Sequence, residues 1–164
     1  MNFGAAIITT ICANRESMPG DSQLSWEGNK GFSTPKVFRI GTSIYGIAGD
    51  CFGNVFIEWA EKGFNQKQKP TWGPKDIEDV DFDVLELSPT GLWLWDKHLV
   101  RMRVKDDNLS IGSGSKFAIV FMRKLGMSPE EAVRECCEWD DYTRGPVDVL
   151  YLKEVKVETP TKKS

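Results

Sequence analysis

The chain carries a run of ten uncharged residues near its start, at positions 4–13, and all of them are small or β-branched. Such a run is typical of a buried strand. Asn, Arg, Glu and Ser at 14–17 have turn chemistry, and residues 18–23 are expected to form the returning strand. We therefore expect the chain to begin with two antiparallel strands inside a folded domain.

Further strand and helix patterns follow in a definite order. Strand patterns occur at 36–41, 43–50, 81–96 (a hairpin), 99–104 and 146–158, and a short strand opens the segment 109–126. Helical patterns occur at 51–64, in the rest of 109–126 and at 127–141. The segments 24–35 and 65–79 are expected to be loops, and the tail 159–164 is expected to be frayed. Helices grouped between blocks of antiparallel strands indicate an α+β domain built in layers.

The helix boundaries carry recognisable capping residues. Asp50 is placed to cap the first helix, and Gly63 is placed to end it. Ser128 precedes Pro129 and stands three residues before Glu131, which is the pattern of a capping box.

Length and composition exclude several classes of protein. A chain of 164 residues suggests one domain, over residues 1–164. The net charge of -3, without a basic stripe, argues against a nucleic-acid partner, and no apolar run reaches the roughly 18 residues of a membrane span. The four cysteines form no CxxC pair and His98 is the sole histidine, so we expect neither metal nor cofactor. The cysteines are expected to be reduced thiols of a cytoplasmic protein.

Six short motifs occur in an order that points to one family. They are TTICA (9–13), MPGDS (18–22), TPKVFRI (34–40), YGIAGD (45–50), SIGSGSKFA (110–118) and DDYTRGPVDVLYL (140–152). Each motif is common by itself, but in this order they resemble the proteasome β-subunits and HslV peptidases, which are N-terminal nucleophile (Ntn) hydrolases. The chain is most similar to compact, phage-encoded members.

The resemblance implies a fold and a departure from it. The implied fold is an αββα sandwich, in which two antiparallel sheets are flanked by helices. The family's second helix is missing here, because the polar segment 65–79 stands in its place. We therefore expect a reduced first helical layer.

The resemblance also implies a catalytic threonine, Thr9. A threonine hydroxyl needs a base, and in this family the base is the nucleophile's own α-amino group. A model α-amine has a pKa of about 7.7–8.0, so part of it is neutral near pH 7. By resemblance Lys36 favours the neutral amine, and Asp21 holds the lysine charged and oriented.

Five further residues complete the site that the resemblance implies. Ser113, Asp140 and Thr143 are expected to surround the amine with hydrogen bonds, with Thr143 in place of the commoner serine. The backbone at Ala48 and Gly49 is the candidate oxyanion hole. Each residue also has an ordinary structural explanation: strand positions for the threonine and lysine, and cap, turn or solvated positions for the others.

The position of Thr9 creates a requirement. Its amine is free only after residues 1–8 are removed as a propeptide, and the family usually cleaves after glycine, whereas Ile8 precedes Thr9 here. A gapless overlay on HslV would instead put the cleavage point at Gly4–Ala5 and leave a dead site.

Three functions fit the resemblance. The first is a threonine-type peptidase that forms a homo-oligomeric ring, cleaves peptides or proteins, and uses an unidentified ATPase or virion partner. The second is a catalytically silent structural or virion assembly protein. The third is an Ntn amidohydrolase that acts on a small amide. A cytoplasmic location is expected, in the host if the chain is phage-encoded, with a virion-associated location as the alternative.

Overall fold

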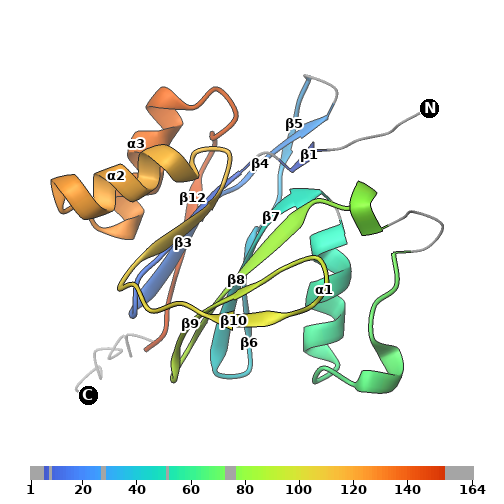
Figure 1. Cartoon of the computed structure of the whole chain (residues 1–164). Coiled ribbons are helices and arrows are strands. Elements are labelled where there is room, and N and C mark those ends of the chain that lie inside the picture. Colours follow the sequence, from blue (N-terminus) through green and yellow to red (C-terminus); the bar gives the residue numbers. More distant parts are fainter. Residues whose placement is uncertain (1–5, 8, 27–28, 51, 73–76, 154–164) are drawn as a thin grey trace, which may run out of the picture.

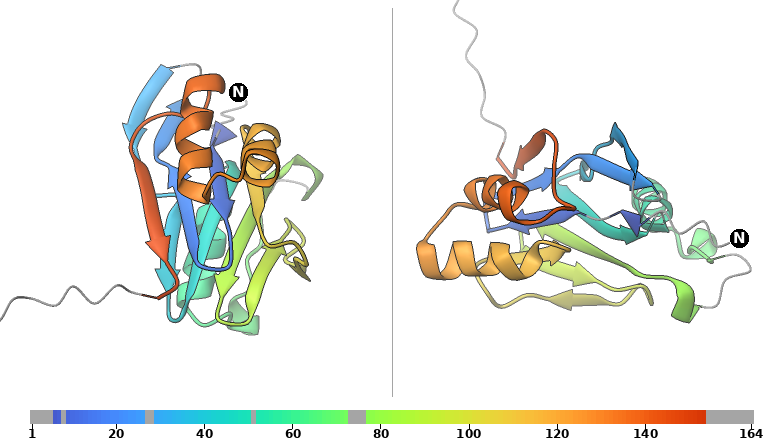
Figure 2. Two further views of the ribbon diagram at one scale, coloured as in Figure 1. Left: turned by 90° about the vertical axis from the view of Figure 1, so that its left-hand side faces the viewer. Right: turned by 90° about the horizontal axis from the view of Figure 1, so that it is seen from above.

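The chain folds into four layers, with two β-sheets packed face to face between two layers of helix (Figures 1 and 2). The computed structural model describes residues 6–7, 9–26, 29–50, 52–72 and 77–153. The expected frayed tail, 159–164, and most of the proposed propeptide lie outside these residues.

The larger sheet has six antiparallel strands. They are β1 (Ala6–Ile7), β6 (Val37–Ile40), β7 (Ser43–Asp50), β8 (Phe82–Ser88), β9 (Gly91–Trp95) and β10 (Arg101–Arg103). Their order is β1-β7-β8-β9-β10, and β6 also pairs with β7. β8 pairs with residues 44–49 along one edge of β7. On the other edge, β6 pairs with residues 43–46 and β1 pairs with residues 49–50.

The smaller sheet has four antiparallel strands in the order β11-β2-β3-β12. They are β2 (Thr10–Ala13), β3 (Ser17–Asp21), β11 (Leu109–Gly112) and β12 (Val147–Tyr151). A separate two-stranded sheet joins β4 (Gln23–Trp26) to β5 (Asn29–Ser33).

The helices cover the outer faces of the two sheets. α1 (Phe52–Glu61) lies on the larger sheet, and α2 (Ser115–Leu125) and α3 (Pro129–Trp139) lie together on the smaller one (Figure 1). Two short 3₁₀ turns follow α1, at Gln66–Gln68 and Ile77–Asp79. Among the described residues of 65–79 there is no α-helix, so the first helical layer is reduced as expected.

Strand β2 shows why the opening run carries no charge. Ile11 is buried among the residues between the two sheets, whereas its neighbour Cys12 is buried against α2 and α3. Successive side chains of a strand point to opposite faces, so a strand between two covered faces must be apolar throughout. The prediction of a buried strand is therefore confirmed for residues 10–13.

The prediction of one continuous strand over 4–13 is wrong. Ala6 and Ile7 pair with the larger sheet, whereas Thr10 begins the smaller sheet. The chain crosses between the sheets at Thr9, whose carbonyl accepts the Ser113 N–H at 2.8 Å. An uncharged run shows that a segment is buried but does not mark where it changes sheets.

The prediction of a loop at 24–35 is also wrong. Most of this segment belongs to β4 and β5, which pair through Gln23 with Ser33, and Trp26 with Asn29. Glycine and serine are poor strand formers, but backbone hydrogen bonds between two adjacent segments do not depend on their side chains.

The hairpin, helix and capping predictions are confirmed. Ser128 accepts the Glu131 N–H at 3.2 Å, and the Glu131 carboxylate accepts the Ser128 N–H at 2.7 Å. Asp50 accepts the Phe52 N–H at 2.9 Å, and Gly63 ends the α1 segment with a positive φ of 69°. Within the described ranges, no helix is long and apolar enough to cross a membrane.

Candidate active site

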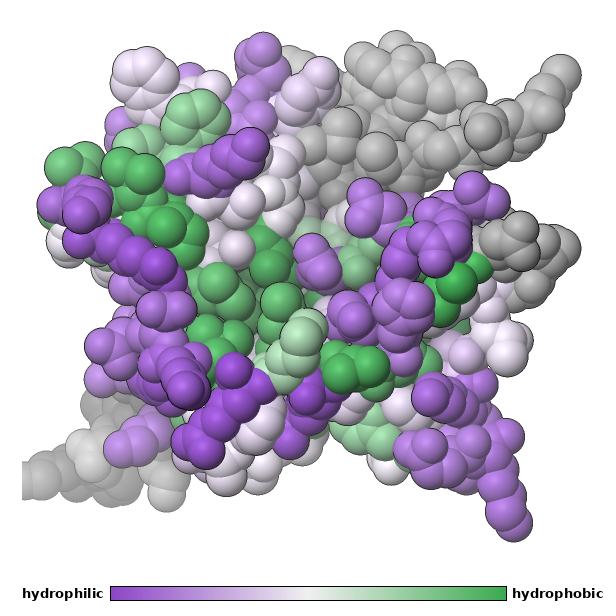
Figure 3. Space-filling model, viewed as in Figure 1, coloured by the Kyte–Doolittle hydropathy of each residue, from purple (hydrophilic) through white to green (hydrophobic). Residues whose placement is uncertain are grey.

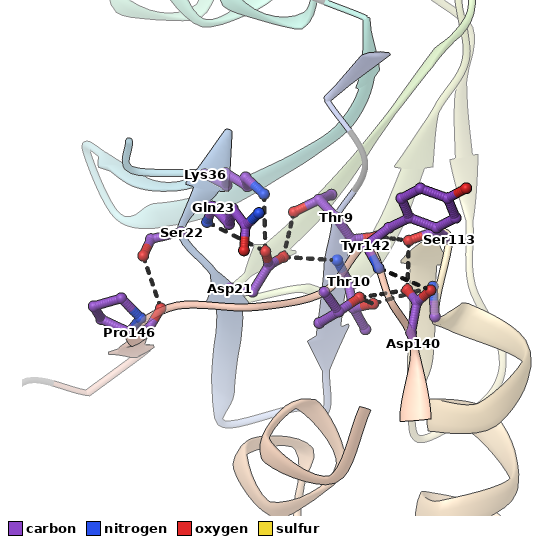
Figure 4. Close-up of polar contacts among 12 residues, drawn as sticks. Thr9, Thr10, Asp21, Ser22, Gln23, Lys36, Ser113, Asp140, Tyr142 and Pro146 are labelled. Atoms are coloured by element: carbon purple, nitrogen blue, oxygen red, sulfur yellow. Dashed lines mark hydrogen bonds and ion pairs between the residues drawn. The ribbon is translucent and has the colours of Figure 1, made fainter. Parts of the chain in front are cut away.

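The candidate site lies where the chain passes from one sheet to the other. Thr9 stands at the crossover, Asp21 ends β3, and Lys36 directly precedes β6 (Figure 4). All three are buried, with 0%, 0% and 1% of their surface exposed. The structure thus brings together three residues that are far apart in the sequence and gives none of them an exposed strand position.

The Asp21 carboxylate is the centre of this group. One of its oxygens accepts the Thr9 hydroxyl at 2.5 Å and the Thr10 N–H at 2.8 Å. The other accepts the Lys36 ammonium at 3.0 Å and the Gln23 N–H at 3.3 Å. Four donors on one buried carboxylate satisfy both of its oxygens and fix its orientation.

Lys36 pairs with Asp21 in the interior of the protein. Burial lowers the pKa of Lys36, and the adjacent Asp21 carboxylate acts in the opposite direction through its charge and hydrogen bond. The Asp21 carboxylate, 3.0 Å from the buried ammonium, stabilises its charged form. The Thr9 hydroxyl and the Lys36 ammonium thus bind the two oxygens of one carboxylate.

A second group approaches Thr9 from the helical layer. Asp140 directly follows α3, and one of its oxygens accepts the Ser113 hydroxyl at 2.7 Å and the Thr143 hydroxyl at 2.6 Å. Ser113 also donates its N–H to the Thr9 carbonyl at 2.8 Å. The three residues that the sequence predicts around Thr9 are therefore gathered beside it.

The candidate oxyanion-hole residues occupy the end of β7. Gly49 has a φ of 115°, and an added Cβ would lie 2.3 Å from the Asp81 carbonyl oxygen. Gly49 is the strand partner of Ile7, two residues before Thr9, and Ala48 is its buried neighbour. The segment ahead of Thr9 thus lies along the β7 edge that holds the candidate oxyanion hole.

Thr10 is a site residue that sequence reasoning missed. Its side chain is fully buried, and its hydroxyl lies 2.6 Å from the Thr143 hydroxyl and accepts the Gly114 N–H at 3.1 Å. The sequence signal for Thr10 was a second hydroxyl directly beside Thr9 in an otherwise apolar run. A buried hydroxyl is costly unless it has a hydrogen-bond partner, so a second one in such a run points to a polar site.

Gly112 permits the close approach of the Ser113 turn to Thr9. Its φ is 94°, and an added Cβ would lie 1.9 Å from the Thr9 carbonyl oxygen.

Among the described residues no group of three or more His, Cys, Asp or Glu could hold a metal ion. Burial raises the pKa of the Cys12 thiol to about 12, so this cysteine is not a nucleophile near neutral pH.

We expect Gly112→Ala to destabilise the protein more than Gly126→Ala. Both glycines have a positive φ, but an added Cβ at Gly126 meets nothing within 4 Å. The control should lose about 1–2 kcal/mol of unfolding free energy from backbone strain alone. Gly112→Ala should lose about 1–3 kcal/mol more, because the Thr9 backbone must move. Urea denaturation measures both, and equal losses would contradict the close approach.

Comparison with known proteins identifies the fold. No family model matches the sequence, and no curated protein matches it. Among solved structures, Thiobacillus denitrificans BPH is similar with a TM-score of 0.65 and 20% identity, over 88% of this chain and 98% of that chain. The same protein in complex with epoxomicin gives a TM-score of 0.63 and 19% identity, over 89% and 99%.

A second protein with this fold is eukaryotic HslV from Trypanosoma brucei. It matches with a TM-score of 0.65 and 20% identity, over 87% of this chain and 98% of that chain. The chain therefore has the HslV-like Ntn sandwich fold, with two antiparallel sheets between helices and a reduced first helical layer.

Proposed function

We propose that this chain is a threonine-type peptidase of the proteasome and HslV family, with Thr9 as its nucleophile once residues 1–8 are removed. The observation that carries the proposal is the buried contact of the Thr9 hydroxyl with Asp21 at 2.5 Å, backed by the Asp21–Lys36 ion pair at 3.0 Å. A buried hydroxyl, carboxylate and ammonium in one group are costly to fold and are typical of a site with a chemical task.

The proposed mechanism uses the free α-amine of Thr9 as the base. The neutral amine takes the hydroxyl proton while the oxygen attacks a peptide carbonyl, and the protonated amine then gives that proton to the leaving amine. The ammonium of Lys36 favours the neutral amine, and Asp21 holds both the lysine and the hydroxyl in place. Water then attacks the acyl-enzyme ester and regenerates the threonine.

The second group of residues would orient the new terminus. In the proposal, Ser113 and Asp140 hold the amine, Thr143 supports Asp140, and the N–H groups at Ala48 and Gly49 stabilise the oxyanion. The anchored Thr9 carbonyl, 2.8 Å from the Ser113 N–H, supports this arrangement because it limits rotation of the threonine.

The partners follow from the same proposal. Phe117, Val120 and Leu125 project from α2 with 48%, 50% and 62% of their surfaces exposed, and hydrophobic surface gathers over this part of the molecule (Figure 3). Exposed apolar side chains on one helix support a protein partner, and we propose a homo-oligomeric ring. We further propose a phage-encoded protein of the host cytoplasm, with an ATPase or virion partner.

A silent assembly protein is the second candidate, and one observation favours it. Thr9 is fully buried in the uncut chain, and β1 occupies the edge of β7 beside the candidate oxyanion hole. A chain that is never cut would keep the fold without the amine base and would act only through its surfaces.

An assay of a chain that starts at Thr9 separates these functions. Such a chain is obtained by removing a fusion partner that replaces residues 1–8, and it is tested against fluorogenic peptides and small amides. Hydrolysis of peptides supports the peptidase, and hydrolysis of small amides alone supports an amidohydrolase. No hydrolysis of either class supports the silent assembly protein and contradicts our proposal.

A further inference from the structure

We propose that Thr10 is a positioning residue for the reaction at Thr9, a role that rests on the proposed function. Thr10 is fully buried and links Asp21, which it contacts directly, to Thr143, the hydroxyl that donates to Asp140. Its N–H donates to Asp21 at 2.8 Å, and its hydroxyl lies 2.6 Å from Thr143, which donates to Asp140.

The direction of these hydrogen bonds follows from counting protons. A hydroxyl has one proton to donate, and a carboxylate can only accept. Because Thr143 gives its proton to Asp140 at 2.6 Å, it must accept a proton from Thr10. Thr10 in turn accepts the Gly114 N–H at 3.1 Å. The bonds therefore run in one direction, from Gly114 through Thr10 and Thr143 to Asp140.

Each hydroxyl in this chain of hydrogen bonds has a single proton to donate. Successive hydrogen bonds that point in one direction strengthen one another in a buried site. Without the Thr10 hydroxyl, the Gly114 N–H loses its acceptor and the Thr143 oxygen loses its donor. Both losses fall on the turn and loop that hold Ser113 and Asp140.

Thr10 also controls how Thr9 is presented. The Thr10 N–H and the Thr9 hydroxyl share one oxygen of Asp21, at 2.8 Å and 2.5 Å. A shift of Thr10 would therefore turn the Thr9 hydroxyl relative to the Asp21–Lys36 pair and relative to Ser113. Thr10 lies between the two acidic groups and fixes their separation across the nucleophile (Figure 4).

The test compares Thr10→Val, Thr10→Ser and Thr10→Cys in the chain that starts at Thr9. Thr10→Val keeps the shape and the N–H but removes the hydroxyl, whereas Thr10→Ser keeps the hydroxyl. We expect Thr10→Val to lower kcat by about 10- to 100-fold with KM within about twofold, because misplacement of reacting groups acts on the chemical step. Thr10→Ser should retain kcat within about threefold, and Thr10→Cys should fall between the two variants.

Ser110→Ala is the matched control. Ser110 is also a buried hydroxyl of the smaller sheet, but it donates to the Ile11 carbonyl at 2.8 Å, outside the candidate site. The control should change the melting temperature without changing kcat. If Thr10→Val does not fold, the test is the comparison of the other two variants, in which Thr10→Ser should have a higher kcat than Thr10→Cys.

Three outcomes would overturn the proposal. They are an unchanged kcat in Thr10→Val, a rise in KM alone, and a loss in Thr10→Ser as large as that in Thr10→Val, which would show that keeping the hydroxyl does not keep the rate. If the Thr9-start chain itself hydrolyses no peptide, the proposed function fails and this role fails with it.

Discussion

Replacing Thr9 by alanine is expected to lower peptide hydrolysis by the Thr9-start chain at least about a thousandfold, as for loss of other catalytic nucleophiles. The alanine keeps the α-amine and removes only the hydroxyl that donates to Asp21. Thr9→Ser keeps a hydroxyl and should retain measurable activity. The loss of activity should therefore depend on whether residue 9 has a side-chain hydroxyl, because both variants keep the α-amine.

Thr42→Ala is the matched control for this experiment, because Thr42 is exposed in the turn between β6 and β7. Its rate should equal that of the parent chain. A rate for Thr9→Ala within a few-fold of the parent chain would remove Thr9 from the mechanism.

Replacing Asp21 by asparagine is expected to give the largest loss of stability. The change removes the carboxylate that pairs with the Lys36 ammonium, and only 1% of Lys36 is exposed. Breaking a buried pair on one side costs about 3–5 kcal/mol of unfolding free energy. The double variant Asp21→Asn/Lys36→Met should recover much of that loss, because it removes the buried charge.

The Asp21→Asn variant should also become more stable as pH rises. Burial lowers the pKa of Lys36, and the substitution removes the carboxylate that opposes this shift. In the unfolded chain the pKa of Lys36 has its ordinary value of about 10.4. Between the lowered pKa of the folded variant and this value, the unfolded chain binds more protons than the folded chain. The unfolding free energy therefore rises with pH in that window.

Urea denaturation across alkaline pH measures this slope. The double variant lacks the lysine and should lack the slope at that site. An Asp21→Asn protein that is as stable as the parent, with no added pH dependence, would contradict the buried pair.

Much of this fold was predictable because its signals are local. The capping box at Ser128 and the hairpin at 81–96 are set by neighbouring residues, and both are confirmed. The crossover at Thr9 was not predictable from composition, because both sheets accept the same uncharged residues. The pairing of β4 with β5 was missed for a related reason, since it is made by backbone groups.

The candidate site was predictable through its motifs rather than its spacing. Thr9, Asp21 and Lys36 are distant in sequence and meet only because β2, β3 and β6 approach one another. Thr10 was missed because its contacts, with Thr143 and Gly114, come from the far end of the chain. A β-branched residue in a buried strand gives no sign of such partners.

The proposed mechanism requires that the Ile8–Thr9 bond is broken to create a catalytic amine. The most direct test is the intact mass of the purified full-length chain and of its Thr9→Ala variant, followed by peptide hydrolysis. We predict that the parent loses residues 1–8 and hydrolyses peptides, while Thr9→Ala stays whole and inactive. A parent chain that remains whole and inactive would contradict the account.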